Sequence, residues 1–232
     1  MKGKPDYYWR RSKEEGYPAR SVFKLREIQQ KHHPVAPGSR VLDLGASPGS
    51  WSLWLLDVLG GAGSVTGVDL NDPDGKLLAR KNYRFLRGDF VAEETVRWIR
   101  DHGPYDLVVS DAAPSTTGNR TLDTARSADI ARQVIAICGQ SLVAGGACVL
   151  KIFQGGEERE LLALMRGRFA SARAFKPKAS RSESMETFFI GLGFRGTGPG
   201  TERGAPPDAS PGQGPDGGSQ TGPEVRPPGA RA

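Results

Sequence analysis

The fold is decided by the stretch RVLDLGASPGSW, residues 40–51. Its first five residues form the apolar run of a buried strand that ends at a glycine. Gly45 and Gly49 let the backbone approach a ligand without a Cβ clash, and a helix that begins at Trp51 would point its free N–H groups into the same space. The stretch therefore predicts a strand, a ligand-binding loop and a helix. It is not the G-x-G-x-x-G fingerprint of dinucleotide-binding domains, in which Pro48 would fit poorly.

The same alternation of buried strands and amphipathic helices continues through the chain. Repeated strand–helix units favour an α/β fold with a mostly parallel, seven-stranded sheet and helices on both faces. Such sheets bind ligands beyond the carboxyl ends of their strands, so the residues at those ends are candidates for a site. The predicted strands cover residues 40–44, 64–69, 83–86, 105–110, 147–150, 172–175 and 187–192, and the predicted helices cover residues 21–31, 51–59, 93–100, 125–142 and 157–169.

The 232 residues include 32 Lys and Arg against 26 Asp and Glu, a formal net charge of +6. Residues 195–232 are rich in Gly and Pro, carry four basic and four acidic residues, and lack the apolar side chains of a packed core. We predict a disordered tail there, after a folded domain over residues 35–194 and a basic, aromatic segment over residues 1–34. The net charge then belongs to residues 1–194, which indicates either a polyanionic partner or a balance set for solubility.

Two classes of protein are disfavoured by composition. No apolar run approaches the roughly 20 residues of a membrane-spanning helix, and no apolar segment of a signal peptide follows the basic N-terminus. Cys138 and Cys148 lack the spacing of metal ligands and show no reason to pair, which is typical of a reduced compartment. We expect a cytoplasmic monomer that binds neither a metal nor a membrane.

Acidic residues follow the second and third predicted strands. Asp69 ends the second, where a carboxylate can accept hydrogen bonds from both hydroxyls of a ribose. Asp89 follows the third and could accept one from an exocyclic adenine amine. Taken singly, each also suits a turn or a helix N-cap. Together with the glycine loop, which carries no phosphate-binding lysine, they indicate a pocket for a nucleoside-type cofactor.

A second pair of residues follows the fourth and fifth predicted strands. Asp111 and Lys151 would project from neighbouring strand ends over the same crevice. A lysine at the buried end of a strand is costly unless it is paired. The two residues therefore indicate either a structural ion pair or a catalytic one.

Five short segments share their residues, order and spacing with one family. They are EGYPARSVFKL (15–25), DLGASPGSWS (43–52), SDAAP (110–114), KIFQG (151–155) and SESMETFF (182–189). Over residues 6–193 the chain resembles the FtsJ family of ribosomal RNA ribose 2′-O-methyltransferases. The resemblance implies a Rossmann-like methyltransferase fold with S-adenosylmethionine as the methyl donor.

The resemblance also implies site residues. The family's Lys-Asp-Lys-Glu catalytic tetrad falls on Lys24, Asp111, Lys151 and Glu186. Its cofactor contacts fall on Gly45, Gly49, Trp51, Asp69, Asp89 and Asp111. Two departures stand out: Ser47 and Ser50 replace residues that are often Ala and Gly, and the arginines that often precede the glutamate are missing. Glu183 therefore stays an alternative to Glu186.

These residue types suit methyl transfer to a hydroxyl group. Because the donor already carries a good leaving group, the remaining tasks are in-line alignment and removal of the hydroxyl proton. Lys151 is the candidate to orient or to deprotonate the 2′-oxygen, and we leave both roles open. Lys24 would lower the proton affinity of Lys151, whereas Asp111 and Glu186 would raise it.

The predicted substrate is RNA. Residues 7–13, YYWRRSK, interleave aromatic and basic side chains in a way that suits stacking on unpaired bases and contact with phosphates. The alternative is a helix whose aromatic side chains pack on the domain. The resemblance implies methylation of a uridine ribose in the 23S RNA of the large ribosomal subunit. The alternatives are a tRNA ribose 2′-O-methyltransferase and a catalytically silent RNA-binding factor in ribosome assembly.

Overall fold

The computed structural model of the protein describes residues 7–181 and 183–196. The start of the predicted N-terminal segment and nearly all of the predicted tail lie outside these residues. A seven-stranded sheet in the order β3-β2-β1-β4-β5-β7-β6 forms the centre of the molecule. The strands are β1 (Arg40–Leu44), β2 (Ser64–Asp69), β3 (Tyr83–Arg87), β4 (Tyr105–Ser110), β5 (Leu142–Phe153), β6 (Phe169–Phe175) and β7 (Glu186–Phe194).

Pairing between neighbours is parallel from β3 through to β5, whereas β7 runs antiparallel to both β5 and β6. The predicted α/β class with a mostly parallel seven-stranded sheet is therefore confirmed. The described helices are α1 (Tyr7–Glu14), α2 (Val22–His32), α3 (Ser50–Leu59), α4 (Gly75–Leu78), α5 (Glu93–Asp101), α6 (Arg120–Ser141) and α7 (Glu158–Arg168).

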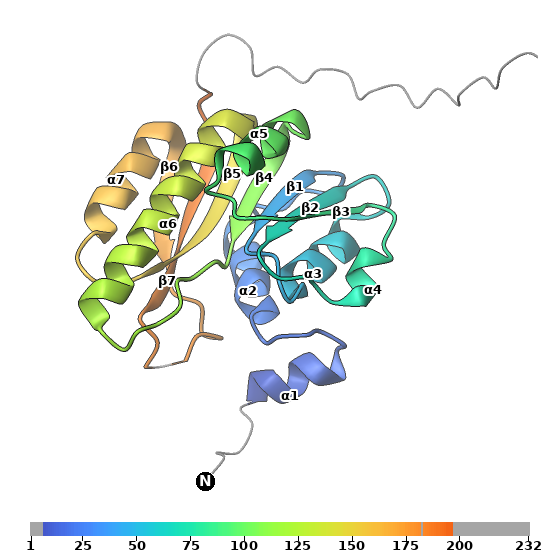
Figure 1. Ribbon diagram of the computed structural model, residues 1–232, viewed down its shortest axis with the longest axis horizontal. Coiled ribbons are helices and arrows are strands. Elements are labelled where there is room, and N and C mark those ends of the chain that lie inside the picture. The colour runs from blue at the N-terminus through green and yellow to red at the C-terminus, as the bar shows by residue number, and fades with distance from the viewer. Residues whose placement is uncertain (1–6, 182, 197–232) are drawn as a thin grey trace, which may run out of the picture.

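Helices cover both faces of the sheet (Figure 1). One apolar cluster joins the sheet to α5, α6 and α7 through buried residues such as Ile99, Ile135 and Leu161. A second cluster joins the opposite face to α2, α3 and α4 through residues such as Ile28, Leu55 and Leu77. Helix α1 lies at the edge of the molecule, beyond the start of α2 (Figure 1).

Two elements start five residues before their predicted positions, and one short helix was not predicted. Strand β5 starts at Leu142 rather than residue 147, because Gly145 and Gly146 interrupt the apolar run that a sequence pattern detects. Helix α6 starts at Arg120, where the Asn119 side chain accepts the Leu122 N–H at 3.2 Å and caps a polar first turn. Helix α4 was not predicted, because four residues are too few to show a period.

The strand order reverses between β1 and β4, since β2 and β3 lie on one side of β1 and β5 lies beyond β4. A doubly wound sheet opens a crevice at such a point, outside the carboxyl ends of its strands. The loops after β1, β2, β3 and β4 all reach this crevice. The fold therefore places the candidate site there.

Candidate active site

A cleft of about 540 Å³ lies at the carboxyl ends of β1 to β4. Four of the predicted cofactor contacts line it, one from the end of each strand: Gly45, Asp69, Asp89 and Asp111. Its remaining walls include Leu70, Phe90, Val91 and the Ala112–Ser115 segment. Three carboxylates and several apolar side chains thus face one hollow whose described lining contains no Lys or Arg.

The glycine loop closes one side of the cleft. Gly45 has φ +80°, and a Cβ at this position would lie 2.8 Å from the Ala112 Cβ. The loop after β1 therefore packs directly against the loop after β4, which only glycine permits here. This contact brings Gly45 and Asp111 to the same end of the cleft.

The two acids predicted to hold a nucleoside have different surroundings. Asp69 is partly buried, and its two oxygens accept the Ser47 N–H at 3.0 Å and the Asn71 N–H at 2.8 Å. Asp89 is exposed and accepts the Val91 N–H at 3.1 Å. Each acid therefore makes the local turn bonds of the structural alternative and also lines the cleft. Carboxylate oxygens have further lone pairs, so these bonds leave acceptor capacity for a ligand.

Two other predicted cofactor contacts lie apart from the cleft lining. Gly49 has φ +107°, and a Cβ there would lie 2.8 Å from the Leu77 Cδ2. Trp51 is 3% exposed, and its indole N–H donates to the Ser21 carbonyl at 2.9 Å. Its ring packs 5.9 Å from that of Phe188, centroid to centroid. Trp51 thus fastens α3 to the start of α2, and a contact with a cofactor stays a prediction.

All four residues of the predicted tetrad gather on one face of the sheet. Val109, Val149 and Phe188 belong to the apolar cluster under α2 and α3, and alternate residues of a strand share a face. The positions two residues away, Asp111, Lys151 and Glu186, therefore point toward α2 as well. Lys24 approaches them from that helix.

The first ion pair joins the ends of β4 and β5. Lys151 Nζ lies 2.9 Å from Asp111 Oδ1, and the two side chains are 9% and 18% exposed. Lys151 also donates to the backbone carbonyl of Asp111. Among the described residues, Asp111 Oδ1 accepts no hydrogen bond of good geometry, so Lys151 holds it mainly by charge. The lysine is thus fixed at a point beside the cleft.

The second ion pair joins α2 to β7. Lys24 Nζ donates to Glu186 Oε2 at 2.8 Å, and these side chains are 12% and 11% exposed. The ammonium also lies 5.8 Å from the centroid of the Phe188 ring, which stands opposite Lys151 in the β5–β7 ladder. Glu183 is exposed in the loop before β7. The geometry favours Glu186 over Glu183 as the partner of Lys24.

The acid of the first strand lies behind the glycine loop rather than in the cleft lining. Asp43 is 1% exposed, and its Oδ2 accepts the Ser52 hydroxyl at 2.6 Å. Burial, together with the nearby Asp111 and Asp69 carboxylates, raises the pKa of Asp43 to about 7 against the lowering effect of the Ser52 bond. Only the depth of the first strand, which a sequence does not give, distinguishes this acid from the exposed ones.

Replacing Asp43 with asparagine should therefore change how stability depends on pH. The folded protein holds a proton on Asp43 up to about pH 7, whereas the unfolded chain releases it near the ordinary value of 3.8. This group stabilises the fold below pH 3.8, and the contribution is lost as pH rises to about 7. The melting temperature of Asp43→Asn minus that of the unsubstituted protein should increase from pH 5 to pH 8. A difference that is constant over this range would contradict the assignment.

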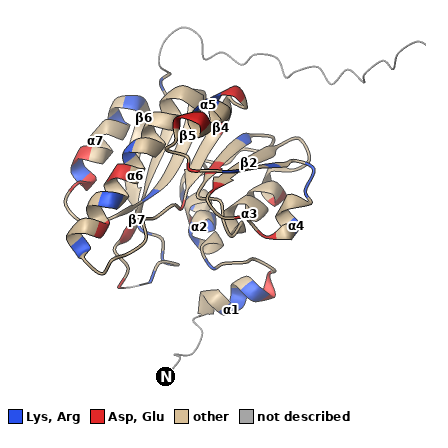
Figure 2. Cartoon of the chain, in the orientation of Figure 1, with Lys and Arg blue, Asp and Glu red and all other residues tan. Residues whose placement is uncertain are grey.

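The aromatic residues of α1 that were predicted to contact RNA have different surroundings. Tyr8 packs against Phe23 with ring centroids 5.4 Å apart, as the structural alternative expects. Tyr7 and Trp9 are 61% and 45% exposed. Basic side chains occupy the second half of α1, ahead of acidic residues at its end (Figure 2). Glu15 forms ion pairs with Arg11 and Arg26, so part of this positive charge is neutralised within the protein.

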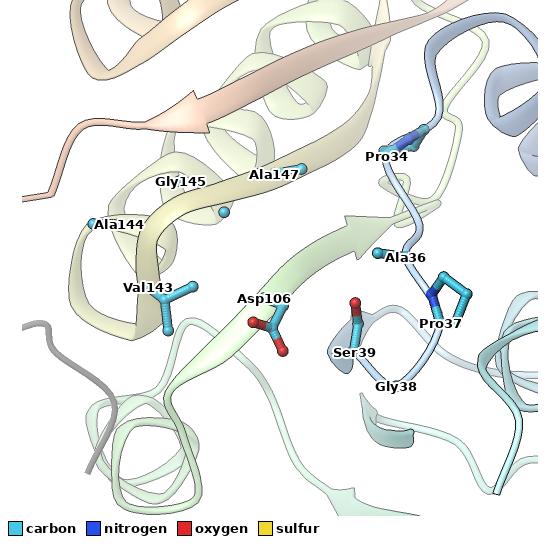
Figure 3. Close-up of a pocket in the computed structure, with 11 residues that line it drawn as sticks. Pro34, Ala36, Pro37, Gly38, Ser39, Asp106, Val143, Ala144, Gly145 and Ala147 are labelled. Atoms are coloured by element: carbon cyan, nitrogen blue, oxygen red, sulfur yellow. The ribbon is translucent and has the colours of Figure 1, made fainter. Parts of the chain in front are cut away.

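A second hollow, of about 340 Å³, lies at the opposite ends of the strands (Figure 3). Pro34, Pro37 and the chain around Gly145 line it, together with Asp106. The Asp106 carboxylate already accepts the Arg40 N–H at 2.9 Å. With this one charged side chain in its described lining, the hollow lacks the convergent chemistry of the cleft.

Three features of the described residues concern membrane-spanning helices, metal-binding groups and disulfides. Within the described ranges, no helix is long and apolar enough to cross a membrane. In the same part of the chain, no three His, Cys, Asp or Glu side chains are grouped so that they could hold a metal ion. Cys138 and Cys148 are both buried and free.

Comparison with known proteins gives the class and then the family. A ribosomal RNA methyltransferase structure from Plasmodium falciparum superposes with a TM-score of 0.68 at 23% identity, over 78% of this chain and all of that one. Fibrillarin from Aeropyrum pernix, solved with S-adenosylmethionine, gives a TM-score of 0.54 at 15% identity, over 74% of this chain and 76% of that one. The fold is thus that of the Rossmann-like methyltransferases.

Other relatives are more similar in sequence than these two solved structures. Ribosomal RNA large subunit methyltransferase E of Treponema denticola is 45% identical over 192 residues, 83% of this chain and 96% of that protein. The protein of the same name from Nitratidesulfovibrio vulgaris is 43% identical over 198 residues, 84% of this chain and 96% of that one. Residues 17–194 match the FtsJ-like methyltransferase family. The chain belongs to this family.

Proposed function

We propose that the protein transfers a methyl group from S-adenosylmethionine to a ribose 2′-hydroxyl of ribosomal RNA in the large subunit. The observation that carries the proposal is the pair of ion pairs, Lys151–Asp111 and Lys24–Glu186, on one face of the sheet beside the cleft. Relatives at 40–45% identity are named as methyltransferases of large-subunit ribosomal RNA.

The cleft fits the proposed cofactor by size and charge. Its volume of about 540 Å³ and its three carboxylates suit a cationic nucleoside, and its described lining offers no cation for a phosphate. Asp69 would hold the ribose hydroxyls and Asp89 the adenine amine. When bound, the cofactor supplies a methyl group activated by a sulfonium leaving group.

The residues of the chain supply orientation and proton management. Lys151 donates one hydrogen bond to the Asp111 carbonyl, which leaves its other positions for a 2′-oxygen at the edge of the cleft. The Lys24–Glu186 pair would set the charge around that oxygen. Lys151 acts there either as an orienting charge or as the base, and Asp111 fixes its position in both cases.

The finer identity of the substrate is part of the proposal. We infer a uridine ribose in 23S RNA from the family resemblance. We infer that it is reached in the assembled large subunit because the chain carries a small basic domain and phosphate contacts position a protein without specifying a site. The N-terminal segment 1–34 would contact this RNA through Tyr7 and Trp9. We further propose that the enzyme acts as a monomer in the cytoplasm, with residues 195–232 outside the methyltransferase domain over residues 35–194.

The choice of substrate is tested by methyl transfer from labelled cofactor. Large subunits from a strain that lacks this methylation should accept label, and purified tRNA should not. The reverse result would establish the tRNA alternative. Label in neither substrate, with the cofactor bound normally, would favour the catalytically silent assembly factor.

Asp69→Ala should weaken S-adenosylmethionine binding by about 1.5–3 kcal/mol, because a hydrogen bond to a charged group is lost. Titration calorimetry on the purified protein measures this directly. Asp57→Ala is the matched control, since Asp57 is an exposed acid in α3 that pairs with Arg80. Equal affinities of the two variants would remove Asp69 from the cofactor site.

A further inference from the structure

Glu27 lies on α2, one helical turn after Lys24, and binds a backbone turn rather than a side chain. Its two carboxylate oxygens accept the N–H groups of Lys178 at 2.7 Å and Ala179 at 2.8 Å. Both residues belong to a tight turn, Pro177–Ser180, that is closed by the Ser180 N–H and the Pro177 carbonyl at 3.1 Å. One carboxylate thus holds two consecutive amides in the connection between β6 and β7.

Other contacts seat the same turn, hereafter the 177–180 turn. The Arg20 guanidinium donates to the Ala179 carbonyl. Ala179 is fully buried in the apolar cluster that contains Ile28 and Phe188. Arg20 and Glu27, which precede and follow Lys24 in the sequence, therefore both hydrogen-bond to the backbone of the turn.

The seated turn has an inner and an outer side. Pro177 and Ala179 are buried, whereas Lys176, Lys178 and Arg181 are exposed. Lys176 donates its ammonium to the Ser184 carbonyl at 2.8 Å, which uses part of its donor capacity. Within the described ranges, Lys178 is bound through its backbone N–H alone, and its side chain is exposed. The turn thus presents cations near the Lys24–Glu186 pair.

We propose that Glu27 is a positioning residue, which fixes the 177–180 turn so that Lys178 meets a phosphate of the RNA strand that carries the target ribose. The inference rests on the proposed function. Phosphate contacts set the register of a nucleic acid on a protein. A turn held at three backbone atoms places Lys178 at a defined distance from the Lys24–Glu186 pair, whereas a loop without these bonds would not.

The sign of the effect separates this role from simple charge. Glu27 is an acid beside a surface that would bind a polyanion, so removing it should strengthen RNA binding if only net charge mattered. Positioning predicts the opposite, because the amides of Lys178 and Ala179 would lose their acceptor and the turn would lose its place. The structure therefore predicts weaker RNA binding from a substitution that makes the protein more positive.

The experiment compares Glu27→Ala, Lys178→Ala, their double variant and Gln30→Ala, a control at an exposed position of the same helix. The dissociation constant for large-subunit RNA, KM, kcat and the cofactor affinity are measured for each. Each single variant should raise KM and the RNA dissociation constant by about tenfold, the equivalent of one charge-assisted contact. The double variant should be no worse than either single variant, and Gln30→Ala and all cofactor affinities should be unchanged. The slope of the logarithm of RNA affinity against the logarithm of salt concentration should become shallower in Lys178→Ala and in Glu27→Ala, by about the amount that one phosphate contact contributes.

Three results would overturn the inference. These are a lower KM in Glu27→Ala, an approximately hundredfold effect in the double variant, or an unchanged KM in Lys178→Ala. If Glu27→Ala fails to fold, Glu27→Gln replaces it, since glutamine keeps the volume but turns one acceptor into a donor that faces an N–H. An unchanged KM in Glu27→Gln would also overturn it. Unsubstituted protein that binds RNA but methylates none would refute the proposed function and leave the binding comparison intact.

Discussion

Replacing Lys151 with alanine is expected to lower the rate of methyl transfer by about 10²- to 10⁴-fold, the usual contribution of a positioned acid–base group. Lys151 Nζ is held 2.9 Å from Asp111 beside the cleft, and β5 carries no second lysine. Cofactor affinity should change little, because Lys151 is absent from the cleft lining. Single-turnover kinetics with labelled cofactor and saturating substrate measures the effect on the chemical step.

The control for this result must separate chemistry from folding. Removal of Lys151 leaves the partly buried Asp111 carboxylate without its cation, which lowers stability as well. The melting temperature and the cofactor affinity of Lys151→Ala should therefore be measured beside those of Lys81→Ala, a substitution of an exposed lysine. A folded Lys151→Ala protein with near-normal turnover would remove Lys151 from the mechanism.

Glu186→Gln is the second substitution with a large expected effect, about 10²-fold or more on the rate. The glutamine keeps the volume of the side chain but cannot balance the charge of Lys24, which lies 2.8 Å from the carboxylate. Glu183→Gln should have near-normal activity, because Glu183 is exposed in the preceding loop. Rates for the two variants, measured under identical conditions, decide between the two glutamates. An inactive Glu183→Gln with an active Glu186→Gln would reverse the assignment.

The order of strands and helices could be predicted because most strands contain a short apolar run, and the first, second and fourth are closed by a glycine or an acid. The same pattern located Asp69, Asp89, Asp111 and Lys151, since strand ends are visible in a sequence. It could not place the start of β5, because Gly145 and Gly146 separate the first residues of that strand from the apolar run that the pattern detects. The local sequence pattern therefore predicts the order of the strands and helices but not the irregular segments.

Contacts between distant segments could not be derived from spacing. Lys24 and Glu186 are 162 residues apart, and only the family resemblance linked them before the structure showed their ion pair. The burial of Asp43 depends on how α3 packs over the first strand, where the Ser52 hydroxyl donates to its carboxylate. The 177–180 turn and its bonds to Glu27 depend on how α2 lies against the β6–β7 connection. Each of these is a property of packing, which a single sequence does not display.

The central claim is that the methyl group is attached to a ribose 2′-oxygen. It is tested most directly by incubating the protein with labelled S-adenosylmethionine and unmethylated large subunits, and then digesting the RNA to nucleosides. The account predicts label in a single 2′-O-methylated nucleoside, 2′-O-methyluridine, whose position also resists alkaline cleavage of the chain. Label in a nucleoside methylated on its base would contradict the account.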